Sequence, residues 1–358
     1  MTMDDFDEYL RQGEPNKAEK AKVWKTAIGL QQVDGLKPSE YLITTAKENI
    51  EGDITIGEVK QRIDTYYQQH PSKSNDDRTE EADKVSARIA EILGEQTFTF
   101  SLADFLAIHR RLFSGIYKHA GKIRDYNITK QEWILNGETV LYASANSLKA
   151  TLEYDFEQEK KFTYKELSEQ EIIEHVAHFI SGFWQIHIFG EGNTRTIAIF
   201  LIKYLRKLGF KKVNNDLFAE HSWYFRNALV RANYEDLSKG IYKTDKYLVM
   251  FLANLLLKEN HVLKNREMHV QQIIKTTKSS EKITKNSEKI TKSSEKITKS
   301  SEKILRLIKV NTQITIKQLA QELGLSTRSI EKNIAKLKLE KRLERIGGDK
   351  GGFWKTMG

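Results

Sequence analysis

The chain has 358 residues, contains no cysteine and carries a formal net charge of +9. Without cysteine, without an apolar run of about 18 residues and with an acidic start, it fits neither a disulfide-stapled scaffold nor a transmembrane or secreted protein, and a cytoplasmic protein of two or three domains is predicted. Residues 271–358 have 21 Lys and Arg against 9 Asp and Glu, whereas residues 1–270 have 37 against 40, so a polyanionic partner is expected only at the tail.

Proline occurs only at positions 15, 38 and 71, and a largely helical body is therefore predicted. Residues 1–100 are interpreted as an N-terminal region of helices separated by polar turns. Within this region, residues 41–49 (YLITTAKEN) form a short predicted helix that places Thr44 and Glu48 on one face. Spacing alone favours an ordinary solvated helix face.

A β-hairpin is predicted over residues 131–143 (QEWILNGETVLYA). Asn136 and Gly137 lie there between two apolar, β-favouring runs, which is the strongest short-range signal for a hairpin. Because a lone hairpin is only marginally stable, a decorative hairpin without function is the alternative.

The most informative stretch is residues 187–195 (HIFGEGNTR). Residues 171–184 before it repeat apolar side chains at helical spacing, and residues 194–208 after it form an almost wholly apolar helix of the buried kind. The stretch is therefore predicted to be a short loop that leads into a helix N-terminus. Unpaired N–H groups and the positive end of the helix dipole can hold a phosphate there.

The residue types in this loop suit phosphate chemistry. His187 is the group expected to titrate near neutral pH, so it can act as a general base. Glu191 offers a hard oxygen ligand for Mg2+, Gly192 lets a ligand approach the backbone, and Asn193 suits a helix N-cap. Arg195 can grip a phosphate bidentately. Each residue alone also fits a structural role, but five compatible types in this order favour a functional site.

A seven-residue unit, SSEKITK, repeats from residue 278 to residue 303, with isoleucine at positions 283, 290, 297 and 304. A coiled coil needs two apolar positions in each heptad, and this repeat offers one. Residues 271–303 are therefore interpreted as a solvated basic linker, and oligomerisation is the alternative.

Three short helices are predicted after the linker, at 304–310, 316–323 and 326–338. Gly324 is placed to end the second helix, and Ser326 is placed to cap the third.

Residues 343–357 then predict a small hairpin whose turn is the glycine-rich GGDKGG. Three helices and a two-stranded wing resemble a winged helix-turn-helix over residues 304–358. Thr327, Arg328 and Lys332 are predicted to face a groove or the phosphates of duplex DNA. Contact with a protein is the alternative, because winged helices are reused for that purpose.

The sequence HIFGEGNTRT resembles the signature of the Fic family, usually written HPFx(D/E)GNGRxxR, and the resemblance extends over roughly residues 100–260. It includes residues 119–127 (HAGKIRDYN). Fic enzymes mostly transfer AMP from ATP to a hydroxyl group of a target. The resemblance implies a mainly α fold: an all-helical Fic core at 101–270 with a β-hairpin flap, followed by the small winged helix-turn-helix domain.

The resemblance also assigns roles within the loop. It implies His187 as base, Glu191 as Mg2+ ligand, Gly192, Asn193 and Thr194 as an anion hole, and Arg195 on the β- and γ-phosphates. Gly192 favours nucleotidyl transfer over the phosphorylation catalysed by the related Doc kinases, which have alanine at this position.

Outside the loop, the resemblance implies that residues 134–137, including Ile134 and Leu135, form the flap over the nucleotide and the target backbone. It also implies that residues 224–233 line the adenosine pocket, with Asn233 contacting adenine.

The sequence departs from the family signature at three positions. Ile188 replaces proline, Thr194 replaces the third glycine, and Ala198 replaces a second arginine that contacts the γ-phosphate. Many Fic proteins carry a self-inhibitory helix with the pattern (S/T)xxxE(G/N), which residues 44–49 match. Because that glutamate usually pairs with the missing second arginine, Glu48 is expected to restrain activity through Arg195.

The sequence therefore predicts a protein adenylyltransferase that uses ATP and Mg2+ and modifies a Ser, Thr or Tyr hydroxyl of a partner or of itself. A DNA-binding transcriptional regulator whose Fic-like body senses a nucleotide is the alternative. A different donor, such as UTP, GTP or a phosphocholine carrier, is a further alternative within enzymes.

Overall fold

The computed structural model describes residues 6–12, 14–71, 78–210, 213, 216–271, 301, 303–340, 342–346 and 353–357. They belong to two compact units, Met1–Ile274 and Lys275–Gly358. Most of the predicted linker and the glycine-rich turn at 347–352 lie outside the described residues.

The N-terminal part of the first unit is helical, as predicted. Its elements are α1 (Asp7–Gln12), α2 (Pro15–Gly29), the 3-10 helix η2 (Leu30–Asp34), α3 (Glu40–Glu51), α4 (Ile56–Gln69) and α5 (Thr79–Gly94). The helix predicted at 41–49 is confirmed within α3. It begins at Ser39, whose side chain accepts a hydrogen bond from the Leu42 N–H, and it ends at Gly52 with a positive φ of 94°.

The rest of the unit is also built from helices. They are α6 (Leu102–Phe113), η3 (Trp133–Leu135), η4 (Ala145–Ser147), α7 (Leu148–Lys161), α8 (Glu169–Ile186), α9 (Asn193–Lys207), α10 (Asp216–Ala232), η5 (Leu237–Lys239), α11 (Lys246–Leu257) and α12 (Asn265–Met268). Every residue of α9 from Asn193 to Leu205 is buried, so α9 is the central helix that its apolar sequence predicts.

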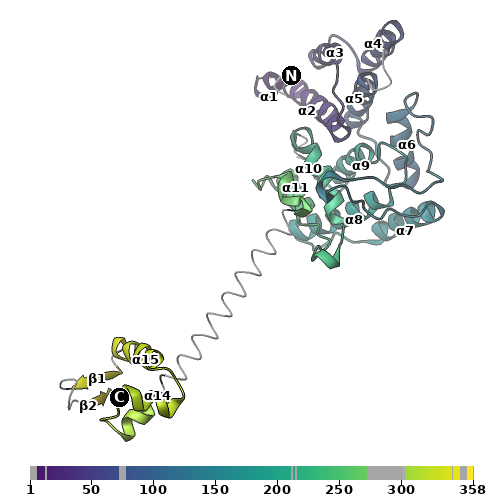
Figure 1. Cartoon of the computed structure of the whole chain (residues 1–358). Helices are drawn as coiled ribbons and strands as arrows, with labels where there is room; N and C mark the ends of the chain where they lie inside the picture. The colour runs from purple at the N-terminus through teal and green to yellow at the C-terminus, as the bar shows by residue number, and fades with distance from the viewer. Residues whose placement is uncertain are drawn as a thin grey trace. The chain divides into compact units, whose positions relative to one another are not determined.

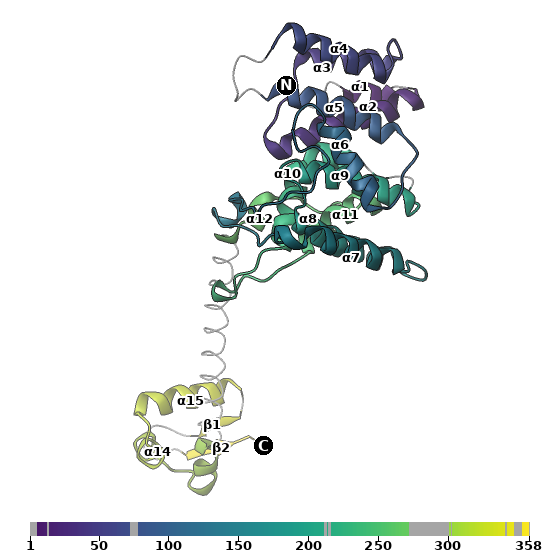
Figure 2. The ribbon, with the colours of Figure 1, turned by 90° about the vertical axis from the view of Figure 1, so that its right-hand side faces the viewer.

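One hydrophobic core runs through the whole unit, from Phe6 to Val270. The regions predicted at 1–100 and 101–270 therefore share their packing, although Figures 1 and 2 show α1 to α5 gathered at one end of the unit. Helices α2 and α10 cross so closely that a Cβ added to Gly29 would lie 2.3 Å from the Ala219 Cα. Glycine is required at that crossing because no side chain fits between the two backbones.

The flap segment differs from its prediction. A turn forms at Asn136 and Gly137, which have positive φ values of 58° and 87°, but residues 131–143, all described, contain no strand. The segment instead forms η3, and Ile134 and Leu135 are fully buried. The hairpin prediction is wrong here because the adjacent side chains of Ile134 and Leu135 both pack into the core, whereas a strand directs adjacent side chains to opposite faces.

The second unit contains a helix over residues 303–310, α14 (Ile316–Leu323), α15 (Thr327–Leu339), and the antiparallel strands β1 (Leu343–Ile346) and β2 (Phe353–Thr356). Gly324 ends α14 in the left-handed conformation, and the Ser326 side chain accepts a hydrogen bond from the Ser329 N–H, as predicted. Ile304, the last isoleucine of the repeat, lies in the core of this unit together with Trp354.

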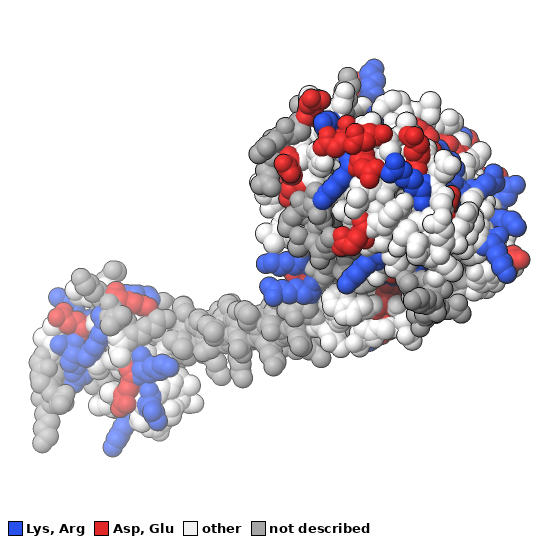
Figure 3. Space-filling view, turned by 90° about the horizontal axis from the view of Figure 1, so that it is seen from above, with Lys and Arg blue, Asp and Glu red and all other residues white. Residues whose placement is uncertain are grey.

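Lys and Arg predominate over Asp and Glu among the described side chains of the second unit, as Figure 3 shows for one face. No helix in the described part of the chain is long and apolar enough to cross a membrane.

Candidate active site

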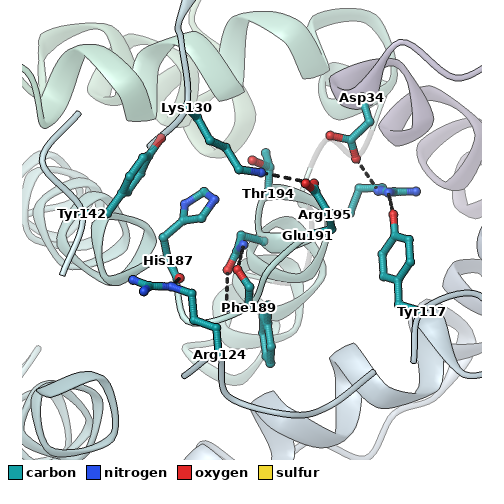
Figure 4. A network of polar contacts seen from close by, with 12 residues as sticks. Asp34, Tyr117, Arg124, Lys130, Tyr142, His187, Phe189, Glu191, Thr194 and Arg195 are labelled. Atoms are coloured by element: carbon teal, nitrogen blue, oxygen red, sulfur yellow. Dashed lines mark hydrogen bonds and ion pairs between the residues drawn. The ribbon is translucent and has the colours of Figure 1, made fainter. Parts of the chain in front are cut away.

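The predicted loop joins α8 to α9. Figure 4 shows His187, Phe189 and Glu191 of this loop from close by. His187 ends α8 in the left-handed conformation, and its N–H donates to the Trp184 carbonyl at 3.0 Å. Gly192 precedes α9 with a φ of 77°, and a Cβ added there would lie 2.4 Å from the Phe113 ring. Both backbone conformation and space therefore require glycine at position 192.

Arg124 holds the start of the loop through main-chain oxygens. Its Nε donates to the His187 carbonyl at 2.7 Å, and its Nη2 donates to the carbonyls of Ala143 at 2.6 Å and Ile186 at 3.3 Å. Its backbone N–H also donates to the Ile188 carbonyl at 3.0 Å. The sequence placed Arg124 within a family-like segment, but only the structure reveals that it fixes the main chain around His187.

His109 of α6 holds the other end of the loop. The Gly121 N–H donates to its Nδ1 at 2.8 Å, so its Nε2 carries the proton and donates to the Glu191 carbonyl at 3.0 Å. The imidazole stacks on the Phe189 ring with 3.6 Å between centroids. Burial lowers the pKa of His109 to about 4, so it stays neutral. Sequence reasoning missed this residue because its partners are main-chain atoms far along the chain.

Asn193 and Thr194 shape the loop with their side chains. The Asn193 Oδ1 accepts from the Phe189 N–H at 3.0 Å, and its Nδ2 donates to the Phe189 carbonyl at 2.8 Å. The Thr194 Oγ1 accepts from the Trp184 indole at 3.1 Å. Their side chains are therefore engaged within the protein, which leaves the main chain as the group that can meet an anion.

The N-terminus of α9 has no side-chain cap. Its first backbone hydrogen bond runs from the Thr196 N–H to the Gly192 carbonyl at 3.1 Å. The N–H groups of Asn193, Thr194 and Arg195 precede that bond, so they have no acceptor in the helix. Together with the helix dipole, these three groups suit a phosphate.

The His187 imidazole is 4 % exposed and lies against the Tyr142 ring, with 4.4 Å between centroids. Neither ring nitrogen has a hydrogen-bond partner among the residues that the structure describes. Burial, followed by the charges of Lys130, Arg124 and Arg226, holds the pKa of His187 well below its ordinary value. The imidazole is therefore neutral at pH 7, which is the form that accepts a proton.

Glu191 points its carboxylate out of the loop, and about half of its side chain is exposed. Its Oε2 lies 3.1 Å from the Nζ of Lys130. Figure 4 marks this ion pair with a dashed line. This carboxylate is therefore accessible and already faces a cation.

Arg195 lies inside the protein. Its Nε is 2.8 Å from the Asp34 carboxylate, and its Nη2 is 2.7 Å from that of Glu81. Its Nη1 donates to the Gln31 side chain at 2.9 Å, and its guanidinium lies 4.8 Å from the Phe113 ring centroid. In the structure, two carboxylates from the N-terminal helices enclose the Arg195 guanidinium, and its contact with the β- and γ-phosphates stays a prediction.

The inhibitory contact predicted for α3 is not formed either. Glu48 forms an ion pair with Arg62 of α4 at 2.6 Å, and both side chains are substantially exposed. The Thr44 hydroxyl donates to the Glu40 carbonyl at 3.1 Å, within its own helix. The predicted pair between Glu48 and Arg195 is therefore wrong, and Asp34 and Glu81 occupy that place.

Two other predicted residues are held within the fold. The Asn233 Nδ2 donates to the carbonyls of Ser181 at 2.8 Å and Leu229 at 3.0 Å. Ala198, which replaces the second arginine of the signature that the sequence resembles, is fully buried in α9. An adenine contact by Asn233 stays a prediction.

In the second unit, Thr327, Arg328 and Lys332 are exposed on α15, in its first two turns. The structure thus places the three predicted DNA-binding residues on one accessible end of this helix. Their contact with DNA stays a prediction.

Residues 99–205 match the family model of the Fic/DOC family, and residues 301–353 match that of an HTH domain. The chain therefore contains a Fic/DOC domain and, nearer its C-terminus, a helix-turn-helix domain. Among solved structures, a Fic family protein from Desulfovibrio desulfuricans G20 matches with 13% identity and a TM-score of 0.41, over 99% of this chain and 93% of that chain. No curated protein matches this chain.

Proposed function

We propose that this Fic protein transfers AMP from ATP to a Ser, Thr or Tyr hydroxyl of a partner protein or of itself. The observation that carries the proposal is the buried, neutral imidazole of His187 directly before the uncapped N-terminus of α9. A general base beside an anion-binding helix N-terminus suits the transfer of a nucleotidyl group to a hydroxyl.

In the proposed reaction, His187 takes the proton of the target hydroxyl. The hydroxyl oxygen forms a bond to the α-phosphorus of ATP, and the bond from that phosphorus to the bridging oxygen breaks. Pyrophosphate leaves with the bonding electrons. The N–H groups of Asn193, Thr194 and Arg195 hold the phosphate oxygens at the start of α9.

Glu191 suits Mg2+ because its carboxylate is accessible and already attracts the Lys130 ammonium. The described residues contain no group of three His, Asp or Glu side chains that could hold a metal by themselves. Glu191 would therefore share Mg2+ with water and the phosphates of ATP. Bound there, Mg2+ would neutralise phosphate charge.

For the second unit, we propose binding to duplex DNA through the first turns of α15. A DNA-binding regulator whose Fic domain senses a nucleotide is the second candidate function. It is favoured by Ala198, which removes one phosphate-binding arginine, and by the burial of Arg195.

The full chain is incubated with Mg2+ and α-labelled ATP, and protein-bound label is measured. His187→Ala is expected to lose about 10²- to 10⁴-fold in rate. His178→Ala is the matched control, because that histidine is exposed and pairs with Asp245 away from the loop. Label that persists in His187→Ala would overturn the mechanism. The same assay is repeated with UTP, GTP and a phosphocholine donor. If the protein binds a nucleotide but transfers no group from any of these donors or from ATP, the result would favour the regulator whose Fic domain senses a nucleotide.

A further inference from the structure

We propose that Lys130 is the side chain that binds the β- or γ-phosphate of ATP in this site. In the structure it holds Glu191, and it exchanges that carboxylate for a phosphate oxygen when the nucleotide binds. The inference rests on the proposed function and supplies the positive charge that neither motif arginine provides.

The first argument for Lys130 is that the two arginine positions of the motif offer no exposed positive charge to the distal phosphates. A triphosphate is strongly anionic, and its distal phosphates need a cationic partner in addition to N–H groups. Arg195 is enclosed by Asp34 and Glu81, and position 198 is alanine. Neither position can therefore supply an exposed guanidinium.

The remaining nearby arginines are also engaged. Arg124 donates to the main-chain carbonyls of His187 and Ala143, and Arg226 pairs with the buried Glu132 at 2.7 Å. Among the described cations that act on His187, Lys130 alone faces the metal-binding carboxylate of the loop.

The position of Lys130 suits such an exchange. Its Nζ lies 3.1 Å from the Glu191 Oε2, and Figure 4 shows its side chain extending toward Glu191 with the His187 ring nearby. About a quarter of its side chain is exposed, and about half of that of Glu191. An ion pair exposed to this degree contributes little to stability, so replacing one partner costs little.

Lysine chemistry fits the role as well. The ammonium is a compact charge with three donors on a flexible four-carbon stem, so it can follow a phosphate over several ångströms. The main chain of Lys130 is anchored, because its N–H donates to the Thr139 hydroxyl at 3.3 Å. The Lys130 ammonium can therefore move toward a phosphate while the main chain of Lys130 stays beside the loop.

The test compares nucleotides with and without distal phosphates by isothermal titration calorimetry on the full chain with Mg2+. The ligands are α,β-methylene-ATP, in which the bond that the proposed transfer would break cannot be cleaved, and AMP. The proteins are wild type, Lys130→Met, Lys130→Arg and Lys122→Met, whose lysine is an exposed residue of the same segment. Thermal unfolding of each variant is measured alongside.

Lys130→Met is expected to weaken binding of the ATP analogue about tenfold to hundredfold, with AMP binding and thermal unfolding unchanged. Lys130→Arg is expected to retain most of the affinity, and Lys122→Met all of it. An equal loss for AMP and the analogue, or no loss for either, would overturn the role of Lys130. If the contrast is found but the wild type transfers no label from ATP, the proposed transferase fails while the role of Lys130 stands. Wild type that binds neither nucleotide would overturn both.

Discussion

The carboxylate of Glu81 on α5 lies 2.7 Å from the guanidinium of Arg195 on α9, and both side chains are buried. Asp34 reaches the same guanidinium at 2.8 Å, and Tyr117 donates its hydroxyl proton to Glu81 at 2.6 Å. A motif arginine of the loop is thus an internal cation that joins the N-terminal helices to the core.

We expect Glu81→Gln to lower the free energy of unfolding by about 3 kcal/mol, because it leaves the buried Arg195 short of one carboxylate. Glu80→Gln is the matched control: Glu80 pairs with Lys84 at the surface, where about 0 to 1 kcal/mol is expected. Urea unfolding of both variants measures the difference. Equal decreases would show that the Glu81 pair contributes no more than a surface pair.

The same carboxylate predicts how stability depends on pH. Burial raises the pKa of Glu81, but the charge of Arg195 and the hydrogen bond from Tyr117 outweigh it, so the pKa lies below its ordinary value of 4.5. A carboxyl whose pKa is lowered in the folded state stabilises the protein fully above pH 4.5 and loses that contribution as the pH falls through the folded pKa. Wild type should therefore lose stability more steeply than Glu81→Gln below that pH in urea titrations. If the free energy of unfolding falls equally steeply with pH in both proteins below pH 4.5, the lowered pKa of Glu81 would be contradicted.

The transfer reaction should tolerate mild acid. Burial and three neighbouring cations hold the pKa of His187 well below 6.5, so the base stays unprotonated. The labelling rate is therefore expected to stay level from about pH 8 to about pH 6 and to fall only at lower pH. A fall centred near the ordinary histidine pKa would mean that His187 is solvated during the reaction.

Gly192 and Gly137 offer a matched comparison. Both have positive φ, but a Cβ at 192 would meet the Phe113 ring at 2.4 Å, whereas nothing lies within 4 Å of one at 137. We expect Gly137→Ala to cost about 1 to 2 kcal/mol for its conformation alone, and Gly192→Ala to cost more and to reduce nucleotide binding. Equal unfolding free energies would show that the Phe113 ring moves aside freely.

The second unit should bind DNA electrostatically. Replacing Arg328 and Lys332 by alanine in the full chain is expected to weaken duplex binding and to reduce the slope of log K against log salt by about 1 for each phosphate that the protein no longer neutralises. Lys309→Ala, on the helix at 303–310, is the control for loss of charge alone. An identical slope in wild type and the double variant would place the DNA-binding surface elsewhere or favour a protein partner.

The sequence predicted those features of the fold that depend on residues close together in the chain. The loop between α8 and α9, the burial of α9, the Gly324 end of α14 and the Ser326 cap of α15 all follow from neighbouring residues. The turn at Asn136 was also predicted, but its strands were not formed, because an apolar run does not reveal whether it alternates at a surface or enters a core.

Long-range partners could not be predicted in the same way. Glu81 is separated from Arg195 by 114 positions, and nothing in the order of residues distinguishes it from the adjacent Glu80. His109 is separated from Glu191 by 82 positions and binds a carbonyl, which every residue possesses. Such contacts depend on how helices pack, so the partner predicted for Arg195 from sequence alone was wrong.

The hydrogen bond from the His109 imidazole to the Glu191 carbonyl affects the kinetics of ligand binding. It holds the backbone of Glu191, while about half of the side chain of the same residue remains exposed. A ligand therefore meets a main chain that is already held in place and a carboxylate that is accessible. Association should follow a single fast phase limited by encounter, without a slow step in which the loop becomes ordered.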